Sequence, residues 1–574
     1  MQLRSLKWFD HPYAETKFQH LAAARACGHI PESFVGKPII GIMNSWNDLN
    51  SCNAPHKQLV EYVKRGVLLG GGYPLEFHSI TTAADFVKPS DLPYRNLMSM
   101  DIEEMIRSMP IDGVVLLCEC DKTTPGQLMA AASCDLPAIQ LAAGHRSSGT
   151  FQGKPIHYGT DLWKYADDYR AGKISDSDWR ELESCMSCSS GGCPVMGTAS
   201  TMKSLSEMLG MMLPGSSSIP ANHTQRLTVA EQTGIEIVRM VHRQLTPSRL
   251  MTEPAFANAI KLLAALGGST NAVIHLIAIA GRLGIRLSLD DITRLSSDAP
   301  LLVNLMPNGQ YSMDDFFAAG GLSAVISMLL PLLDGDALTA TGRSVRDTYQ
   351  HCPVHAADVI RPLDRPVQAQ SGIVVLTGNL APHGAVLKRS ASSGHLHNHR
   401  GQAIVFDDYE QMLAALEDES LDVTADSVLV LRQCGPVGAG MPEWGAIPVP
   451  RKLLRQGVRD IVRITDSRMS GTSSGTIVLH VAPEAAVGGT IGLIENGDWI
   501  ELDVAAGQLR LDVADEVLQE RASRRIAKPY DHVRGFMKLS HDHILQAHEG
   551  CDLDFLKPAG KDEAKFISPI VGRG

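Results

Sequence analysis

Short apolar segments alternate with helical patterns over the first 140 residues, and this alternation constrains the fold more than any other feature of the chain. Strands are expected at residues 38–43, 75–80, 113–118 and 138–141. Helices are expected between them, at residues 55–69, 100–108 and 125–132. Because buried strands joined through helices form a parallel sheet with both faces covered, we predict an α/β architecture for this part.

The pattern changes twice in the rest of the chain. It first becomes mostly helical, with helices expected at residues 198–211, 230–244, 254–266, 271–283 and 322–330. A polar connector at 347–370 is followed by short strand patterns at 372–376, 402–406, 427–431, 460–464, 476–481, 490–493, 498–503 and 508–512. These strands predict a β-rich, barrel-like C-terminal domain. We therefore place an N-terminal α/β domain at residues 1–365 and the β-rich domain at 366–574.

The bulk composition describes an ordinary globular chain. Its 574 residues are too many for one core, and its apolar content is 44%. The net charge of −11 argues against a nucleic-acid partner, because phosphate binding needs clustered Lys and Arg. The N-terminus lacks the apolar core of a signal peptide, and the longest apolar run, residues 322–333, is too short to span a bilayer. We expect a cytoplasmic protein with no membrane partner, whose 11 cysteines are free, catalytic or metal-bound.

Three cysteines lie in loop-like sequence far apart along the chain. They are Cys52 in Ser-Cys-Asn, Cys120 in Cys-Asp-Lys-Thr-Thr-Pro-Gly, and Cys193 in Ser-Ser-Gly-Gly-Cys. Cys120 follows the expected strand at 113–118, and open α/β sheets bind ligands at such strand ends. Taken singly, each thiol could pack as a small buried hydrophobe. Three thiolates that meet from separate loops would instead suit an iron–sulfur cluster with one iron left without a cysteine ligand.

Other metal chemistry is open to the same region. Zinc is one alternative, although only Cys185 and Cys188 have the close spacing that structural zinc sites prefer. Asp121 and Lys122 follow Cys120, and a carboxylate suits Mg²⁺, which prefers oxygen ligands. Lysine can join such a site only after carbamylation makes it an oxygen ligand. Glu443 lies in a glycine-rich loop, and by itself it is better explained as a surface residue.

A serine-rich loop near residue 470 carries a formal hydrolase signature. Residues 471–475 match Gly-x-Ser-x-Gly, with Ser473 at the nucleophile position. In serine hydrolases this motif connects a strand to a helix. Residues 476–481 read as a strand instead, which argues against a hydrolase and leaves a simple turn as an alternative reading.

Taken together, these segments resemble the dihydroxy-acid dehydratase and phosphogluconate dehydratase family, which includes dehydratases of sugar acids (aldonates). The stretches at 120–126 and 465–472 resemble its two signature segments. Further familial stretches lie at residues 51–53, 197–202, 213–218, 267–271 and 378–382. The resemblance covers residues 35 to 555, and several motifs in order make it specific.

The resemblance implies a set of site residues and a reaction. It implies an iron–sulfur cluster on Cys52, Cys120 and Cys193, and Mg²⁺ near Asp121, carbamylated Lys122 and Glu443. Lys122 and Ser470 would be catalytic, with the Ser470 alkoxide removing the proton from C2 of the substrate. Ser470 and Thr472 would also bind the substrate. The family reaction removes water from a 2,3-dihydroxy acid and gives a 2-keto-3-deoxy acid.

The chain departs from the family pattern at two positions. An acidic Mg²⁺ ligand is expected after the second strand, but Ala84 stands there, with Asp85 as the neighbouring candidate. Ser467 replaces the small Gly or Ala that is usual between Asp466 and Arg468.

Within the family, the segments at 192–200 and 94–97 look more like the sugar-acid branch, which favours a [2Fe-2S] cluster over [4Fe-4S]. We therefore expect a hydro-lyase with a small-molecule substrate, assembled as a homodimer or homotetramer. One alternative is a branched-chain dihydroxy-acid dehydratase acting on 2,3-dihydroxyisovalerate. A different class of alternative is a non-catalytic iron–sulfur redox or sensor protein.

Overall fold

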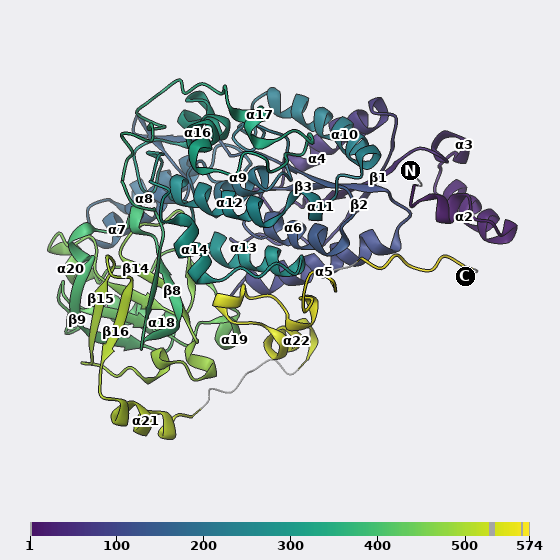
Figure 1. Cartoon of the computed structure of the whole chain (residues 1–574). Coiled ribbons are helices and arrows are strands. Elements are labelled where there is room, and N and C mark those ends of the chain that lie inside the picture. The colour runs from purple at the N-terminus through teal and green to yellow at the C-terminus, as the bar shows by residue number, and fades with distance from the viewer. Residues whose placement is uncertain (1–2, 527–533, 564–565, 573–574) are drawn as a thin grey trace.

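A four-stranded parallel sheet forms the centre of the N-terminal part of the computed structural model, which describes residues 3–526, 534–563 and 566–572 (Figure 1). The strand order is β2-β1-β3-β4, and all neighbouring strands run parallel, as predicted. The strands are β1 (Ile39–Asn44), β2 (Tyr73–His78), β3 (Gly113–Cys118) and β4 (Ala138–Ala142). Every residue of β1, β3 and β4 is buried, which explains why these strands read as continuous apolar runs.

Helices connect the strands and cover the sheet. They are α4 (His56–Leu69), α5 (Leu92–Ser108) and α6 (Thr123–Cys134). α5 begins eight residues before the predicted start, because Pro93 lies in its first turn, where the missing N–H costs no helical hydrogen bond. This earlier start brings Asp91, the residue that precedes α5, to the end of the sheet where the strands terminate.

A helical layer packs on the sheet, as the sequence predicts. Its main members are α9 (Thr198–Met208), α10 (Gln225–Arg243), α12 (Glu253–Leu266), α13 (Asn271–Arg282) and α16 (Gly321–Leu329). α9 ends three residues early, because the chain turns at Gly210 with a positive φ of 78°. α10 lies against α4 at Gly66 and Gly234, where any Cβ atom would overlap backbone of the other helix.

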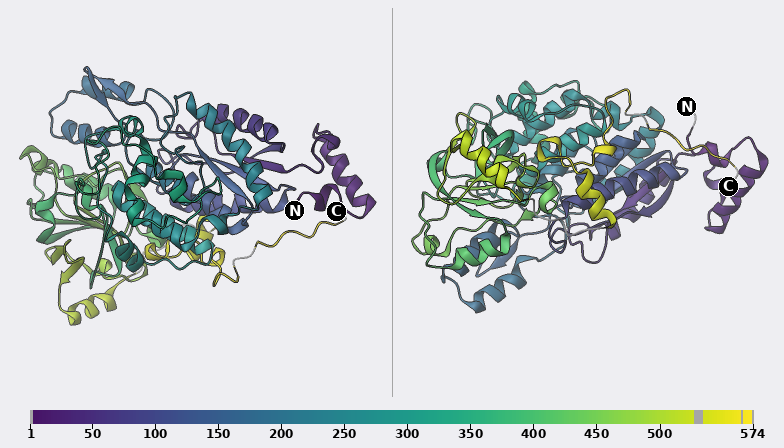
Figure 2. Two further views of the ribbon diagram at one scale, coloured as in Figure 1. Left: turned by 45° about the horizontal axis from the view of Figure 1, so that its top comes forward. Right: turned by 90° about the horizontal axis from the view of Figure 1, so that it is seen from below.

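Smaller elements complete this part. The segment after β4 forms the hairpin β5 (Gly149–Phe151) and β6 (Lys154–Ile156), followed by α7 (Thr160–Arg170) and α8 (Asp176–Met186). The arm α2 (Ala14–Ala26) and α3 (Pro31–Phe34) lies at the end furthest from the C-terminal barrel (Figure 2). Short helices lie at α1 (Leu6–Phe9), α11 (Pro247–Leu250), α14 (Leu289–Ser296), α15 (Met313–Ala318) and α17 (Val345–Tyr349).

The C-terminal part is a closed eight-stranded barrel, in agreement with the predicted barrel-like domain. The strand order is β10-β12-β14-β8-β7-β16-β15-β9. The strands are β7 (Val374–Gly378), β8 (Ala381–Leu387), β9 (Asn398–Phe406), β10 (Val428–Leu431), β12 (Arg463–Thr465), β14 (Ile477–Ala482), β15 (Trp499–Asp503) and β16 (Gln508–Asp512). Helices α18 (Tyr409–Glu417), α19 (Pro436–Ala439), α20 (Arg451–Arg455) and α21 (Asp515–Arg524) lie outside it. Closure removes the sheet edges, which would otherwise pair with other chains.

One strand prediction in the barrel was wrong and one strand was missed. Residues 490–493 form a 3-10 helix, in which the Gly492 N–H bonds locally to the Gly489 carbonyl at 2.9 Å and is not available to a neighbouring strand. β8 was missed, since Pro382 and Gly384 are both unfavourable in strand interiors. The strand tolerates Gly384 at an irregularity in its pairing with β14.

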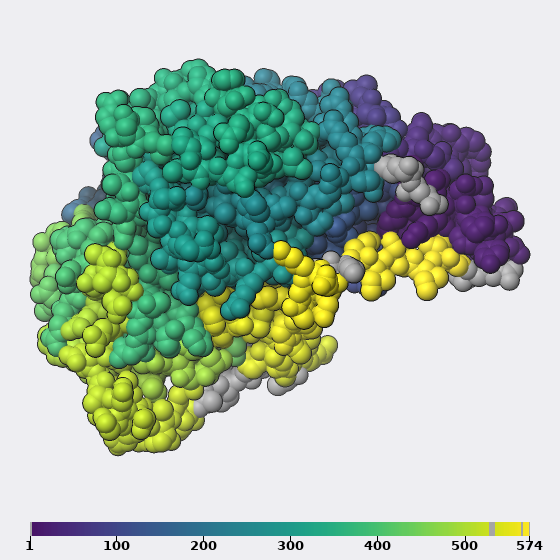
Figure 3. All heavy atoms as spheres, viewed as in Figure 1, coloured from purple at the N-terminus to yellow at the C-terminus, as the bar shows by residue number. Residues whose placement is uncertain are grey.

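The chain returns to the N-terminal part after the barrel. Following α22 (Gly535–His543), residues 544–553 pack on α5 and α13 in an apolar cluster that includes Leu92, Ile274 and Leu553. Figure 3 shows these C-terminal residues along the surface of the N-terminal part. Among the described residues, no helix combines the length and the apolar character needed to cross a membrane. The domain boundary at 365/366 stays a prediction.

Candidate active site

A cavity of about 300 Å³ lies between the loops at the ends of the parallel strands and the loops of the barrel. The predicted site residues that line it are Cys52, Asp85, Cys120, Asp121, Cys193, Glu443, Ser470 and Thr472. They come from segments up to 420 residues apart (52 to 472) in the sequence. Lys122 lies just behind this wall and contacts Glu443. The fold therefore gathers the predicted residues into one place.

The three cysteines occupy one side of the cavity. Cys52 lies in the loop after β1, Cys120 in the turn between β3 and α6, and Cys193 in the loop before α9. The thiol of Cys52 is within hydrogen-bonding reach of Cys120, and this contact together with burial raises the pKa of Cys120. Burial also raises the pKa of Cys193 to about 12. Both thiols stay protonated at neutral pH unless a metal displaces the proton.

Arg146 holds two of the cysteine loops together. Its guanidinium donates hydrogen bonds to the Ser51 hydroxyl and the Gly191 carbonyl, each at 3.0 Å, and to the Ser187 hydroxyl at 3.0 Å. The backbone reinforces this contact, since Gly191 N–H donates to the Ser51 carbonyl at 2.9 Å. The positions of Cys52 and Cys193 are thus coupled through one buried side chain.

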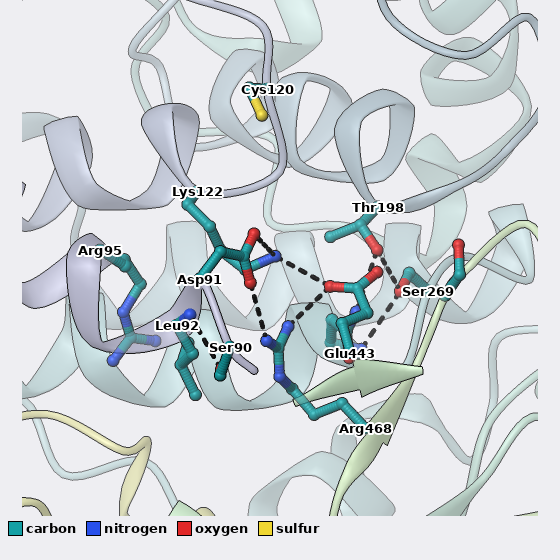
Figure 4. A network of polar contacts seen from close by, with 12 residues as sticks. Ser90, Asp91, Leu92, Arg95, Cys120, Lys122, Thr198, Ser269, Glu443 and Arg468 are labelled. Carbon is teal, nitrogen blue, oxygen red and sulfur yellow. Dashed lines mark hydrogen bonds and ion pairs between the residues drawn. The ribbon is translucent and has the colours of Figure 1, made fainter. Parts of the chain in front are cut away.

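Four charged side chains form a closed ring at the cavity (Figure 4). Lys122 Nζ lies 2.8 Å from Glu443 Oε2 and 3.1 Å from Asp91 Oδ2. Arg468 contacts the same two carboxylates, with Nη1 2.7 Å from Glu443 Oε2 and Nη2 3.1 Å from Asp91 Oδ1. Lys122 and Asp91 come from the N-terminal part, and Glu443 and Arg468 from the barrel. Each buried charge therefore has opposite charges on both sides, which is the condition for burying it.

Asp121 lies beside this ring. Burial and the nearby Glu443 carboxylate raise its pKa to about 7, although Lys122 opposes the shift. Burial is the larger of the two causes, and the Glu443 carboxylate adds to it.

A two-stranded ribbon presents Glu443 and Ser470 together. β11 (Glu443–Trp444) pairs in parallel with β13 (Arg468–Met469), with Glu443 opposite Arg468. Ser470 follows directly, and its N–H donates to the Trp444 carbonyl at 2.8 Å. Thr472 lies close to the Ser470 hydroxyl. The Thr472 N–H donates a hydrogen bond to Ser470 Oγ at 3.3 Å, and the two hydroxyl oxygens lie 2.9 Å apart in a hydrogen bond that either hydroxyl can donate. These contacts fix the Ser470 hydroxyl at the cavity wall, and the amide favours its ionised form.

Close packing fixes this loop against the N-terminal part. A Cβ on Gly471 would lie 2.6 Å from Ser269 Cβ, and a Cβ on Gly197 would lie 2.7 Å from Thr472 Cγ2. From the barrel side, Lys388 Nζ donates to the Gly471 carbonyl at 3.2 Å. A side chain at either position would overlap its neighbours, which are Ser269 and the Thr198 N–H for Gly471 and the Thr472 methyl group for Gly197.

Asp85 and Ser473 are the two remaining predicted features. Asp85 accepts a hydrogen bond from the Tyr158 hydroxyl at 2.9 Å, and it lies on the cysteine side of the cavity. Ser473 donates its hydroxyl hydrogen to the Gly445 carbonyl. Strand β14 follows Ser473 where a nucleophile elbow would need a helix. The hydrolase alternative is therefore not supported by the local structure.

Sequence reasoning missed four side chains of the site. Arg468 stood inside the motif at 465–472, so the motif itself could have drawn attention to it. Asp91, Arg146 and Lys388 carried no signal in the sequence, because only the tertiary fold brings them to the cavity.

The donor chemistry fits two metal groups. Three sulfur donors on one side suit iron, and carboxylate oxygens on the other side suit Mg²⁺. Among residues 3–526, 534–563 and 566–572, no three Cys, His, Asp or Glu side chains already stand at the spacing of a metal site. On the carboxylate side, the Lys122 ammonium occupies the space between Asp91 and Glu443. The residues present therefore fit the two metal groups in the type of their donor atoms and in their gathering at one cavity.

Comparison with known proteins gives the family. Residues 37–348 match the N-terminal domain of the dihydroxy-acid/6-phosphogluconate dehydratases, and residues 358–551 match their C-terminal domain. The chain belongs to this family. It is therefore an enzyme, a dehydratase of the hydro-lyase class, as the motifs predicted.

Individual relatives of this dehydratase match over nearly their whole length. An L-arabonate dehydratase from Azospirillum brasilense is 48% identical, covering 97% of each chain. A 6-deoxy-6-sulfo-D-gluconate dehydratase from Pseudomonas putida is 46% identical, over 97% of this chain and 96% of that protein. A dihydroxy-acid dehydratase from Pyrococcus abyssi is 38% identical, over 92% of this chain and 97% of that protein.

Proposed function

We propose that this dehydratase acts on a sugar acid and converts it into a 2-keto-3-deoxy acid. The observation that carries the proposal is the single cavity in which Ser470, three cysteines and the carboxylates meet. The relatives support the sugar-acid branch, since those named for aldonates are 46–48% identical and the dihydroxy-acid dehydratase is 38% identical.

Two metal groups belong to the proposal. Cys52, Cys120 and Cys193 would hold a [2Fe-2S] cluster, and Asp121, carbamylated Lys122 and Glu443 would hold Mg²⁺. When bound, the open iron would accept the leaving 3-hydroxyl as a Lewis acid, and Mg²⁺ would fix the substrate carboxylate and 2-hydroxyl.

Ser470 would remove the proton at C2. A free serine is a very poor base, so its ionised form needs support from the protein. The Thr472 amide donates to Ser470 Oγ, and the packing of Gly471 against Ser269 prevents the loop from moving away. Thr472 Oγ1 also receives the Trp163 indole N–H at 3.2 Å, so the Thr472 side chain is itself held in place beside the substrate cavity.

The wall of the cavity suits a polyhydroxylated substrate. Away from the metal-binding residues it is lined by Asn50, Lys88, Arg146, Tyr158 and Thr198, all of which can hydrogen-bond to hydroxyl groups. A branched-chain substrate would need an apolar wall, and the apolar side chains here are Val87, Pro89, Leu162, Trp163 and three alanines, interspersed with the polar ones. The lining therefore favours sugar acids over 2,3-dihydroxyisovalerate.

One experiment tests this function. Purified anaerobic enzyme with Mg²⁺ is offered a panel of aldonates, 2,3-dihydroxyisovalerate and glycerate, and the 2-keto acid is measured by colour formation. We expect keto acid from one or more aldonates. Product from 2,3-dihydroxyisovalerate alone would favour the branched-chain alternative. A reversible redox couple without any keto acid would favour the redox or sensor alternative.

Ser470→Ala tests the base within the same assay. We expect turnover to fall by at least about 100-fold while the absorbance of the cluster is kept, because a general base contributes at least this much. Ser473→Ala is the matched control in the same loop, and it should retain turnover. Substantial activity of Ser470→Ala would remove Ser470 as the base.

Assembly as a homodimer or homotetramer and a cytoplasmic location stay predictions.

A further inference from the structure

We propose that Asp91 supplies the carboxylate of the cation site that the family pattern places at position 84, where this chain has alanine. The inference rests on the proposed function, because it concerns the same divalent cation. It assigns to the loop before α5 a ligand that this chain would otherwise lack.

The geometry of Asp91 is that of a ligand held in place. Its side chain is 4% exposed and lies at the cavity wall. Oδ1 faces the Arg468 guanidinium at 3.1 Å, and Oδ2 faces Lys122 Nζ at 3.1 Å. Arg468 thus orients the carboxylate through one oxygen and leaves the other directed at the Lys122 and Glu443 side. Fixing a ligand through its second atom is how proteins orient metal-binding carboxylates.

The ordinary role of an aspartate at this position is excluded by the structure. Asp91 precedes α5, where an aspartate usually accepts hydrogen bonds from the first helical N–H groups. Its carboxylate makes no such bond; the Leu92 N–H donates to the Ser90 hydroxyl instead. Ser90 in turn donates to the Gly440 carbonyl of the barrel at 2.5 Å. The loop is therefore built so that Asp91 is free to face the cavity.

Asp85, the neighbour of Ala84, has a different partner. It is exposed and accepts a hydrogen bond from the Tyr158 hydroxyl at 2.9 Å. Asp91 instead contacts Lys122 and lies near Asp121. Position in the sequence favours Asp85 as the ligand of the cation, whereas position in space favours Asp91.

Charge balance explains why this carboxylate needs a cation once Lys122 is modified. Carbamylation joins Nζ to the carbon of CO₂, releases two protons from the ammonium to solvent, and turns a positive group into a negative one. Among the described residues, Asp91 Oδ2 contacts no other cation than Lys122 Nζ. The modified site would hold Asp91, Asp121, Glu443 and the carbamate against the single charge of Arg468. A divalent cation between them removes the cost of burying unpaired carboxylates.

Mn²⁺ binding tests the assignment without relying on turnover. The full-length holoenzyme is stripped of divalent cations with a chelator and titrated with Mn²⁺, and free Mn²⁺ is counted by electron paramagnetic resonance. Asp91→Asn keeps the shape of the side chain and removes its charge, so Mn²⁺ affinity should fall by at least about tenfold. Asp85→Asn is the matched control, and its Mn²⁺ affinity should equal that of the parent.

Each outcome decides between the two aspartates. Loss of affinity in Asp85→Asn with parental affinity in Asp91→Asn would overturn the assignment, and so would parental affinity in both. Asp91→Ser is a second neutral variant in case Asp91→Asn fails to fold, which thermal unfolding would reveal. Keto-acid formation by the parent is scored separately. A parent that makes keto acid but shows no effect of Asp91→Asn refutes this inference alone, whereas Asp91-dependent Mn²⁺ binding without keto acid refutes the proposed function alone.

Discussion

Buried charged residues in this protein differ in whether an opposite charge faces them. Lys122 is surrounded by Asp91 and Glu443, so its positive charge is compensated. Lys388 is also buried, but within the described part of the chain its amine hydrogen-bonds only to the Gly471 carbonyl, and burial lowers its pKa to about 7. The same residue type therefore carries different charge at neutral pH on the two sides of the site.

Lys388 makes the stability of the protein depend on pH. Its ordinary pKa is 10.5, so between about pH 7 and 10.5 the unfolded chain binds a proton that the folded chain does not. The free energy of unfolding should therefore rise with pH across this window, and Lys388→Met should reduce the rise. Urea unfolding at about pH 7 and about pH 9.5 measures the difference. The exposed Lys154→Met serves as control, and an unchanged slope in Lys388→Met would contradict the prediction.

Arg146 should be needed to assemble the cysteine loops. Arg146→Met removes the hydrogen bonds to Ser51, Ser187 and Gly191, so the loops of Cys52 and Cys193 lose their common partner. We expect less iron and weaker visible absorbance in the anaerobically purified variant. Arg239→Met, at a side chain that is 60% exposed on α10, should keep both. Equal iron content in the two variants would show that the loops assemble without Arg146.

At the scale of elements, the site is built from short segments that lie between the longer helices and strands. β11 and β13 are two residues each, yet their pairing places Glu443 beside Arg468 and leads into Ser470. The loop then passes the start of α9 with no space for a side chain at Gly471 or Gly197. Close packing between the two parts of the chain thus sets where the Ser470 hydroxyl lies.

Gly471→Ala should disable the enzyme without unfolding it. The added methyl would overlap Ser269 and the Thr198 backbone and push the Ser470 loop outward. A displacement of this kind can lower kcat by about 100-fold, while the cluster absorbance should persist. Gly394→Ala is the control, because a Cβ there meets nothing within 4 Å. Parental kcat in Gly471→Ala would mean that the loop is free to shift.

At the scale of the whole molecule, two sets of contacts join the N-terminal part to the C-terminal part. The charged ring joins Asp91 and Lys122 to Glu443 and Arg468, and the C-terminal segment binds back on α5 and α13. In that segment Asp552 contacts Arg282 at 2.6 and 3.0 Å, and Arg95 donates to the Gly550 and Cys551 carbonyls. These contacts hold together the N-terminal and C-terminal parts, between which the cavity lies.

Arg282→Met should strongly destabilise the protein. It removes the salt-bridge partner of the buried Asp552 carboxylate, and breaking a buried ion pair typically costs about 3–5 kcal/mol in the free energy of unfolding. Arg282→Met with Asp552→Leu removes both charges and should recover much of the loss. Chemical denaturation compares the two variants. A double variant no more stable than the single one would show that the segment is held by other contacts.

The sequence by itself determined the architecture and most of the site. Apolar runs such as 113–118 predicted the buried parallel strands, because a strand covered on both faces must be apolar throughout. Turn-separated strands predicted the barrel, and ordered motifs around Cys120 and Ser470 predicted the residues of the cavity. The architecture was predictable because it depends on local pattern, and the motif residues lie at one cavity, while their roles stay predictions.

Only the tertiary structure decided which other residues lie at the site beside those of the motifs. Asp91, Arg146 and Lys388 are ordinary residues in sequence, and their position follows from an early helix start, a loop contact and a barrel strand. Counting along the chain placed Ala84 at the ligand position, with Asp85 as the neighbouring candidate, but in the fold Asp91 contacts Lys122 and Asp85 contacts Tyr158. Distances across a fold depend on how elements pack, and spacing along the chain does not contain that information.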